Sequence, residues 1–247
     1  MESITSRKNE YLQHLKKLAA DGAYRRSCGE FLCDSPKLLD EALKWQAPIT
    51  AVISTDGVEL DGARCVTVPE DVMASVSPMK TPQGVLFTCK MRSAAIPEKL
   101  TGQRYVVLDG VQDPGNVGTV LRTLDAFDGD GLILLARCAD IYSPKTVRAT
   151  MGAIFRRPVY TMTAGEMKDL LTRSGIPLYG AALRDDTADA REVSYRPSAI
   201  AVGSEGRGLT DEVLALCDRT IRIPMSARCE SLNAAIAASV LLWESYR

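Results

Sequence analysis

Short apolar runs alternate with amphipathic segments through the second half of the chain. The runs are rich in Val, Ile and Leu and begin at residues 104, 131, 178, 199 and 220, whereas apolar residues recur every three or four positions in the segments between them. The first pattern predicts buried strands and the second predicts helices. Strands that alternate with helices favour an α/β fold with a mostly parallel sheet covered on both faces.

Capping residues mark the helix starts in this half. At 113–114 and at 143–144 an Asp or a Ser precedes a Pro. This order suits a helix start, because the first side chain caps the backbone and the proline fits the first turn. Thr163 and Glu166 have the spacing of a capping box. We therefore expect helices over 114–127, 144–155 and 163–174.

The first ninety residues show the same alternation in shorter elements. An amphipathic helix is expected over residues 5–20, a second from Ser35 through Trp45, and a short third over 72–76. Strands are expected over 49–54, 64–68 and 84–90. These elements predict a small α/β domain.

A break in this rhythm sets the predicted domain boundary. Residues 91–103 carry Ala94-Ala95, Pro97 and two basic side chains, and they follow neither the helical nor the strand period. We therefore predict a first domain over residues 1–92, a linker over 93–103 and a second domain over 104–247.

Two polar loops follow strands near the end of the chain. Residues 203–208 are glycine-rich and follow the apolar run 199–202, and residues 224–230 follow the run 220–223. The second loop ends at Ser231, which we expect to open an apolar helix. Ligands of parallel sheets bind outside the carboxyl ends of strands, so the two loops predict one shared pocket.

The composition is that of a globular protein, with 46% hydrophobic and 25% charged residues in a chain of 247. No apolar run approaches the ~18 residues of a membrane helix, and the first residues lack the apolar region of a secretory signal, so we expect no membrane association and a cytoplasmic location. The net charge is −1, so an RNA surface would depend on local basic patches. Such residues gather in two segments, although each patch could equally be a solvated face: Arg7, Lys8, Lys16, Lys17, Arg25 and Arg26, and then Lys145, Arg148, Arg156 and Arg157.

The cysteines and the single histidine give little support to several kinds of site. The seven cysteines form no Cys-x-x-Cys pair, which argues against a disulfide framework and a zinc site, so we expect no metal. His14 lies in a helical pattern and is expected on a helix surface. With one histidine, a Ser-His-Asp triad is also poorly supported.

The helix expected over 114–127 carries two candidate site residues. Its apolar stripe leaves Arg122 on the opposite side, among small residues. Arg122 is either an ordinary solvent-facing arginine or one directed at a phosphate or carboxylate. Asn116 could be a site residue or part of the helix N-terminus.

Three more polar residues have two interpretations each. Glu205 could bind amides of its own loop, Ser231 could be the N-cap of the last helix, and Asn233 could lie in its first turn. Each could instead belong to the pocket expected between the two loops.

Three stretches together resemble the SpoU (TrmH-like) class of the SPOUT RNA methyltransferases. They are Asp113-Pro114-Gly115-Asn116-Val117-Gly118 through Arg122, the stretch 201–209 with Gly203-Ser204-Glu205-Gly206-Arg207-Gly208, and Ile223-Pro224-Met225 through Ser231-Leu232-Asn233. Residues 1–90 resemble the L30e-like substrate-binding domain that precedes many such enzymes. The chain departs from the family at Cys33-Asp34-Ser35 and at Ala227, which bears on the choice of RNA.

The resemblance implies a trefoil-knotted catalytic domain that binds S-adenosylmethionine in the knot, mainly through loop backbone. It also implies a homodimer with the active site at the interface. By position, the residues that would contact the cofactor are Gly203, Ile223, Met225 and Leu232.

The implied reaction is methyl transfer to a ribose 2′-hydroxyl in structured RNA. Arg122 matches the family's catalytic arginine, and we expect it to hold the adjacent phosphate and polarise the hydroxyl. The remaining motif positions would orient the ribose and the loops; they are Asn116, Glu205, Ser231 and Asn233.

The substrate expected first is 23S ribosomal RNA, with transfer RNA as the alternative. Two other hypotheses for the function are a non-catalytic RNA-binding protein that keeps the fold and a nucleotide-dependent transferase. The transferase would need a phosphate loop of the Gly-x-x-x-x-Gly-Lys-Ser/Thr type, which residues 204–209 do not supply.

Overall fold

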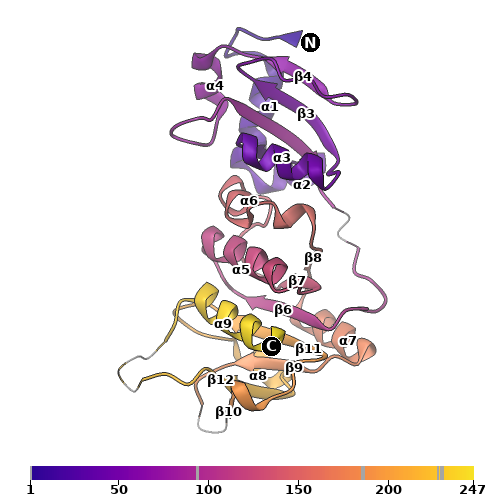
Figure 1. The fold of residues 1–247 in the computed structure, drawn as a ribbon, viewed down its shortest axis with the longest axis vertical. Coiled ribbons are helices and arrows are strands. Elements are labelled where there is room, and N and C mark those ends of the chain that lie inside the picture. Colours follow the sequence, from indigo (N-terminus) through magenta and orange to yellow (C-terminus); the bar gives the residue numbers. More distant parts are fainter. Residues whose placement is uncertain (1, 93–94, 185–186, 227, 229–230) are drawn as a thin grey trace. The chain divides into compact units, whose positions relative to one another are not determined.

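The computed structural model describes residues 2–92, 95–184, 187–226, 228 and 231–247. Contacts divide the chain into two compact units (Figure 1). The first unit comprises residues 1–93 and 140–155, and the second comprises residues 94–139 and 156–247. The assignment of an RNA-binding domain, a linker and a catalytic domain stays a prediction.

The second unit is built on a seven-stranded sheet in which each pair of neighbouring strands is parallel, as predicted. The strand order is β10-β12-β9-β11-β6-β7-β8. The strands are β6 (Arg104–Asp109), β7 (Gly131–Leu134), β8 (Val159–Thr161), β9 (Leu178–Ala181), β10 (Ala188–Asp189), β11 (Ser198–Gly203) and β12 (Arg219–Arg222). All six residues of β11 are buried, which explains its continuous apolar sequence.

Helices cover both faces of this sheet. They are α5 (Pro114–Ala126), α7 (Ala164–Ser174), α8 (Asp211–Leu216) and α9 (Ala234–Tyr246). One core cluster joins Val107 and Ala201 of the central strands to Met167 of α7 and Val213 of α8. Helices α5 and α9 pack side by side, and α9 also contacts β11 (Figure 1).

The first unit holds a mixed five-stranded sheet of order β1-β4-β3-β5-β2. Its core includes Leu12, Leu15 and Leu18, which form the buried stripe of α1. The strands are β1 (Glu2–Ser3), β2 (Glu30–Asp34), β3 (Ile49–Ser54), β4 (Arg64–Thr67) and β5 (Val85–Lys90). The helices are α1 (Glu10–Ala20), α2 (Gly22–Cys28), α3 (Pro36–Lys44), α4 (Glu70–Val76) and α6 (Pro144–Thr150).

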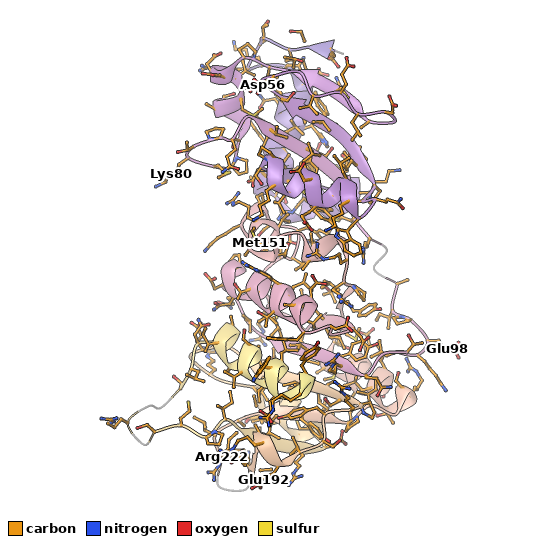
Figure 2. The ribbon with its side chains drawn as sticks, in the orientation of Figure 1. Asp56, Lys80, Glu98, Met151, Glu192 and Arg222 are labelled. Carbon is orange, nitrogen blue, oxygen red and sulfur yellow. The ribbon has the colours of Figure 1, made fainter. Side chains whose placement is uncertain are left out.

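Local capping moves three of the predicted helix limits. The first helix begins at Glu10 and not at residue 5, because the Asn9 side chain accepts the Tyr11 N–H. Helix α6 ends at Thr150 because Met151 (Figure 2) and Gly152 have φ of 48° and 89°; a 3₁₀ turn at Ala153–Phe155 follows. The last helix begins at Ala234 and not at Ser231.

Six of the described α-helices and β-strands were not predicted from the apolar pattern, and they are α2, α8, β1, β2, β8 and β10. Each is short, so its period is hard to detect. The sequence signal for α2 is Asp21, whose carboxylate accepts the backbone N–H groups of Ala23 and Tyr24. His14 of α1 is half-buried, between the Tyr24 hydroxyl and the Glu30 carboxylate, and not on an open helix surface.

Arginines of the two basic patches are paired with carboxylates inside each unit. Arg148 donates to the buried Asp34, and Arg156 and Arg157 both donate to Asp125. Burial raises the pKa of the Asp34 carboxyl, and Arg148 opposes that effect. Much of the second basic patch is therefore structural. Among the described residues, no helix is long and apolar enough to cross a bilayer.

Arg25 of the first patch lies inside the first unit. Its guanidinium donates to the Leu18 carbonyl, and its Nη2 lies 2.7 Å from Oδ2 of Asp140. The Arg25 side chain is 4% exposed and that of Asp140 is 27% exposed. A charge this deeply buried needs a partner, because water is not there to replace one.

We expect Asp140→Asn to lower the free energy of unfolding by about 2 kcal/mol. The amide keeps the shape but leaves the Arg25 charge uncompensated, and the partial exposure of Asp140 reduces the cost below that of a fully buried pair. Urea denaturation measures the change. The control is Asp71→Asn, which removes an exposed pair with Arg7 and is expected to cost under about 1 kcal/mol. Equal effects of the two substitutions would contradict this account.

Candidate functional site

A closed loop at the end of β11 forms the centre of the site. Ser204 N–H donates to the Gly208 carbonyl at 3.0 Å, and Gly208 N–H donates to the Ser204 carbonyl at 2.8 Å. The two ends of the loop come so close that a Cβ on Gly203 would lie 1.9 Å from the Gly208 carbonyl carbon. Gly208 itself has a φ of 65°, which favours glycine. The turn therefore requires glycine at positions 203 and 208.

One cavity lies where β9, β11 and β12 end, and we call it the Met225 cavity. The four residues predicted to contact a cofactor all line it, as does Ser231. Most of the other lining residues are apolar, among them Leu183, Val202 and Ile221. The structure thus brings the two polar loops of the sequence to one cavity, as their position after parallel strands predicted. Ala227, Cys229 and Glu230 of the second loop lie outside the described residues.

Three predicted site residues meet beside this cavity. Asn116 Nδ2 donates to Glu205 Oε1 at 2.7 Å, and Asn233 Nδ2 donates to the same oxygen. Asn233 Nδ2 also lies 3.3 Å from Asn116 Oδ1. The three come from the first turn of α5, the loop after β11 and the position before α9. We call this group the Glu205 cluster.

Asn233 has two functions in the structure. Its Oδ1 accepts the backbone N–H groups of Ala235 and Ile236, so it is the N-cap of α9, while its Nδ2 donates to Glu205. Helix capping therefore fixes the orientation of the amide. Glu205 Oε2 accepts no hydrogen bond from the residues that the structure describes and is available to a hydroxyl group.

The structure does not bring Arg122 and Ser231 into the Glu205 cluster. Arg122 is exposed on α5 and lines neither of the two cavities described here. It follows Asn116 by six residues, which is about 9 Å along a helix. In the described part of the chain, Arg122 has no ion-pair partner. Ser231 faces the Met225 cavity without a hydrogen bond to another described residue.

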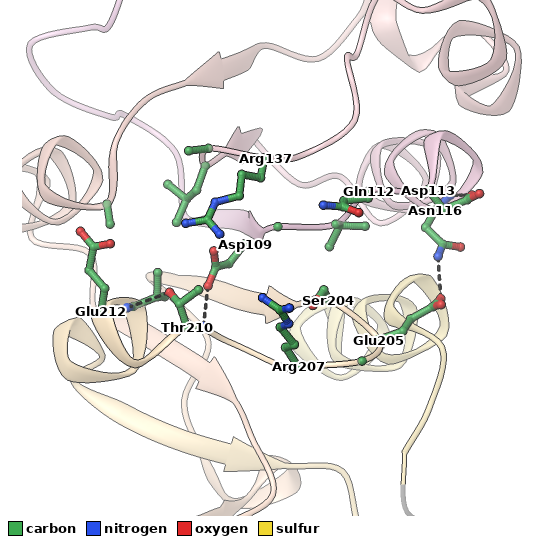
Figure 3. Close-up of a pocket in the computed structure, with 18 residues that line it drawn as sticks. Asp109, Gln112, Asp113, Asn116, Arg137, Ser204, Glu205, Arg207, Thr210 and Glu212 are labelled. Atoms are coloured by element: carbon green, nitrogen blue, oxygen red, sulfur yellow. Dashed lines mark hydrogen bonds between the residues drawn. The ribbon is translucent and has the colours of Figure 1, made fainter.

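A second cavity, of about 470 Å³, lies along the same loop, and we call it the Asp109 cavity (Figure 3). Asp109 is 6% exposed, and its Oδ2 accepts the Thr210 N–H at 2.7 Å. Arg137 and Arg207 also line the cavity. Sequence reasoning missed this cavity, although Asp109 and Arg137 follow the apolar parts of β6 and β7 just as the predicted loops follow their strands.

Burial and hydrogen bonding shift the pKa of several groups in this unit, among them Cys138 and Asp218. Burial raises the pKa of the Cys138 thiol, which donates to the Leu108 carbonyl and is therefore held as a neutral thiol. Burial also acts to raise the pKa of Asp218, but the Leu178 N–H and Lys168 outweigh it and lower the value. Neither group lines the two cavities.

We expect Gly203→Ala to lower the free energy of unfolding by at least about 2 kcal/mol, because the new methyl group meets backbone that cannot move without opening the loop. Gly206→Ala, in the same loop, is the matched control, since a Cβ there meets nothing within 4 Å. Its change should stay within about 0.5 kcal/mol. Thermal and urea unfolding give both values. A loop that tolerates both substitutions equally would contradict the geometry.

Residues 103–243 match the model of the SpoU rRNA Methylase family. The chain is 33% identical over 250 residues to the 23S rRNA (guanosine(2553)-2'-O)-methyltransferase RlmP of Bacillus subtilis, covering 98% of both chains. It is 28% identical over 264 residues to the 23S rRNA (uridine(2479)-2'-O)-methyltransferase of Streptomyces viridochromogenes, covering 99% of this chain and 91% of the relative.

Solved structures agree with these relatives. The AdoMet-bound rRNA methyltransferase from Sinorhizobium meliloti matches with a TM-score of 0.89 and 29% identity, covering 99% of this chain and 97% of that one. AviRb from Streptomyces viridochromogenes, in complex with AdoMet, matches with a TM-score of 0.87 and 26% identity, covering 97% and 98%. The match extends across both compact units, and the chain belongs to the SpoU rRNA methylase family.

Proposed function

We propose that the protein transfers the methyl group of S-adenosylmethionine to the 2′-hydroxyl of one ribose in 23S ribosomal RNA. As a member of its family it is an RNA methyltransferase that uses this cofactor. The observation that carries the proposal is the position of the Glu205 cluster beside the Met225 cavity, in a chain whose full-length relatives are named as rRNA 2′-O-methyltransferases.

The lining of the Met225 cavity suits S-adenosylmethionine. Apolar side chains offer contact surface to an adenine ring, and the backbone at Gly203, Ile223, Met225 and Leu232 offers polar groups to the rest of the molecule. The absence of a side chain at Gly203 lets the two ends of the loop close against each other at the edge of this cavity. When bound, the cofactor supplies a methyl group already activated on a sulfonium, so the protein has mainly to align the hydroxyl with it and to let the hydroxyl proton pass to solvent as the methyl group leaves the sulfur.

The Glu205 cluster would orient the ribose. Two amide groups donate to Glu205 Oε1 and hold the carboxylate in place. Its other oxygen can then accept a hydrogen bond from a ribose hydroxyl at the edge of the Met225 cavity. Ser231, on the wall of that cavity, offers a second hydroxyl contact. Such fixed polar groups need no rearrangement during the reaction.

Arg122 would hold the phosphate next to the target ribose. An arginine stays protonated in proteins, so it is suited to binding phosphate and to polarising the hydroxyl and not to removing its proton. Arg122 is exposed and has no acidic partner among the described residues, which leaves its guanidinium available to RNA. Arg122 lies about 9 Å along α5 from Asn116. It can therefore act with the Glu205 cluster only if the RNA spans this distance or if a second copy of the chain places its own Arg122 beside the cluster.

A homodimer formed through α9 would supply that second copy. Helix α9 is apolar on nearly all sides, and such a helix is normally buried on all sides. One side packs on β11 and α5, but Ile236, Val240 and Trp243 are 51%, 40% and 51% exposed. These residues are spaced by four and three and so share one face. Because α9 packs against α5, this face lies on the helix pair that carries Arg122.

Other features of the proposal rest on the family resemblance alone. They are the trefoil knot, the RNA-binding role of an L30e-like first domain and a cytoplasmic location. The choice of 23S rRNA as the target follows from the named relatives. Transfer of labelled methyl to transfer RNA would identify the alternative substrate.

We expect Arg122→Ala to lower kcat for methyl transfer to unmodified 23S rRNA by at least about 100-fold, because a contact that stabilises developing charge is lost. The affinity for S-adenosylmethionine should change less than about threefold. Transfer of labelled methyl, followed by ribose mapping, measures the first, and calorimetry the second. Arg173→Ala, an exposed arginine of α7, serves as the control. Label on a base, or only on transfer RNA, would contradict the proposed reaction or its substrate.

We expect the double substitution Ile236→Asp and Val240→Asp to convert the protein from a dimer to a monomer, since two buried, unpaired carboxylates would oppose association. Sedimentation velocity measures the mass. Leu43→Asp alters an apolar residue of the first unit that is 44% exposed and should leave the dimer intact. A wild-type protein that sediments as a single chain at micromolar concentration would refute the α9 interface.

A further inference from the structure

The proposed reaction assigns no ligand to the Asp109 cavity. It lies within the second unit and shares Asn116, Ser204 and Glu205 with the site described above. Its volume, about 470 Å³, is within the range of small-molecule sites. The Met225 cavity shares Ser204, Glu205 and Gly208 with it. One loop therefore lines two cavities, of which the cofactor is assigned to only one.

The residues that line the Asp109 cavity include a buried carboxylate and several apolar side chains. Asp109 Oδ2 accepts the Thr210 N–H, whereas its Oδ1 accepts no hydrogen bond from the described residues. Val111, Leu135 and Val213 contribute apolar side chains to the lining. The Asp109 carboxylate lines a cavity that also holds polar groups, and a carboxylate only accepts hydrogen bonds, so it favours a ligand that carries an N–H donor.

Two arginines also line the cavity, together with acidic residues that include Asp113 and Glu212. Figure 3 shows Arg137 and Arg207 on opposite sides of Asp109, one on the segment after β7 and the other on the loop after β11. Neither has an ion-pair partner in the part of the chain that the structure describes. Arg137 also has a φ of 69°, which is uncommon for a residue other than glycine and often marks a functional position.

We propose that the Asp109 cavity binds the guanine base of the target nucleotide, an inference that rests on the proposed function. Asp109 accepts hydrogen bonds from the N1–H and N2–H₂ edge. Arg137 and Arg207 donate to O6 and N7 of the base and to the neighbouring phosphate. Guanine is the base that offers adjacent N–H donors on one edge and the acceptor pair that arginine binds on another. Uracil would place carbonyl oxygens on both sides of its N–H and against the carboxylate.

The position of the Glu205 cluster links this base to the reaction. Asn116 and Glu205 line the Asp109 cavity and belong to the cluster, so a ribose attached to a base in this cavity would lie beside them. The Met225 cavity begins on the other side of Glu205. Proteins read RNA bases that are splayed out of the helix, and a base held in this cavity would be in that state.

Equilibrium binding of guanosine 3′,5′-bisphosphate tests the cavity without requiring methyl transfer. The full chain is first saturated with S-adenosylhomocysteine. We expect the guanosine probe to bind at least fivefold more tightly than the adenosine, cytidine and uridine analogues. The double substitution Arg137→Ala and Arg207→Ala should weaken it at least tenfold, while Arg219→Ala, an exposed arginine outside both cavities, should change it less than twofold.

The preference among the four nucleoside probes distinguishes a loss of base recognition from a loss of fold. Asp109→Asn keeps an oxygen for the Thr210 N–H but places an N–H₂ group where guanine donates, so the guanosine preference should fall to within twofold of the other bases. A general loss of fold would weaken all four probes together. No saturable binding, equal binding of the four wild-type probes, or an equal loss in the Arg219→Ala control would overturn the proposal.

Methylation mapping distinguishes the failure of this inference from failure of the proposed function. Methyl transfer to a uridine or adenosine ribose of 23S rRNA would overturn the guanine site and leave the reaction intact. Selective guanosine binding without methyl transfer to ribosomal RNA would leave the base site intact and overturn the reaction. We expect the mapped nucleotide to be a guanosine, and its replacement by adenosine to lower kcat/KM at least 100-fold.

Discussion

The Glu205 carboxylate holds together three segments that are far apart in the sequence. Asn116 and Asn233 both donate to its Oε1, so the start of α5, the loop after β11 and the start of α9 meet at one oxygen. The closed loop makes this possible, because the backbone bonds between Ser204 and Gly208 fix the position of the glutamate. A carboxylate held by two amides is fixed in direction, which is what alignment of a reacting hydroxyl requires.

The same loop, residues 203–208, lies between two cavities at the carboxyl ends of the strands. Ser204, Glu205 and Gly208 line both the Met225 cavity and the Asp109 cavity. The first lies at the ends of β9, β11 and β12, and the second lies beside the ends of β6 and β7. In a parallel sheet, all these ends lie on one edge, so a cofactor and a substrate can approach a common point from two directions.

The sequence predicted the parallel sheet, several helix starts and one pocket at the two polar loops, because these depend on local patterns, whereas the residues expected to contact the cofactor came from the family resemblance. Asp113 accepts the Asn116 N–H as its cap, and Thr163 and Glu166 form the predicted capping box. The double role of Asn233, as a helix cap and a Glu205 ligand, depends on a contact across 28 residues and could not be read from a pattern. The ion pairs of the second basic patch could not be predicted for the same reason, since the carboxylate that pairs with Arg148 is Asp34, 114 residues away.

The central claim is that this site methylates one ribose of 23S ribosomal RNA. The most direct measurement is a comparison of 2′-O-methylated nucleotides across the 23S rRNA of cells with and without this protein. Our account predicts that one ribose methyl group, on a nucleotide otherwise modified nearly completely, is lost without the protein and returns when the wild-type chain is restored. An unchanged 23S rRNA, or a lost methyl group that maps to a base, would contradict it.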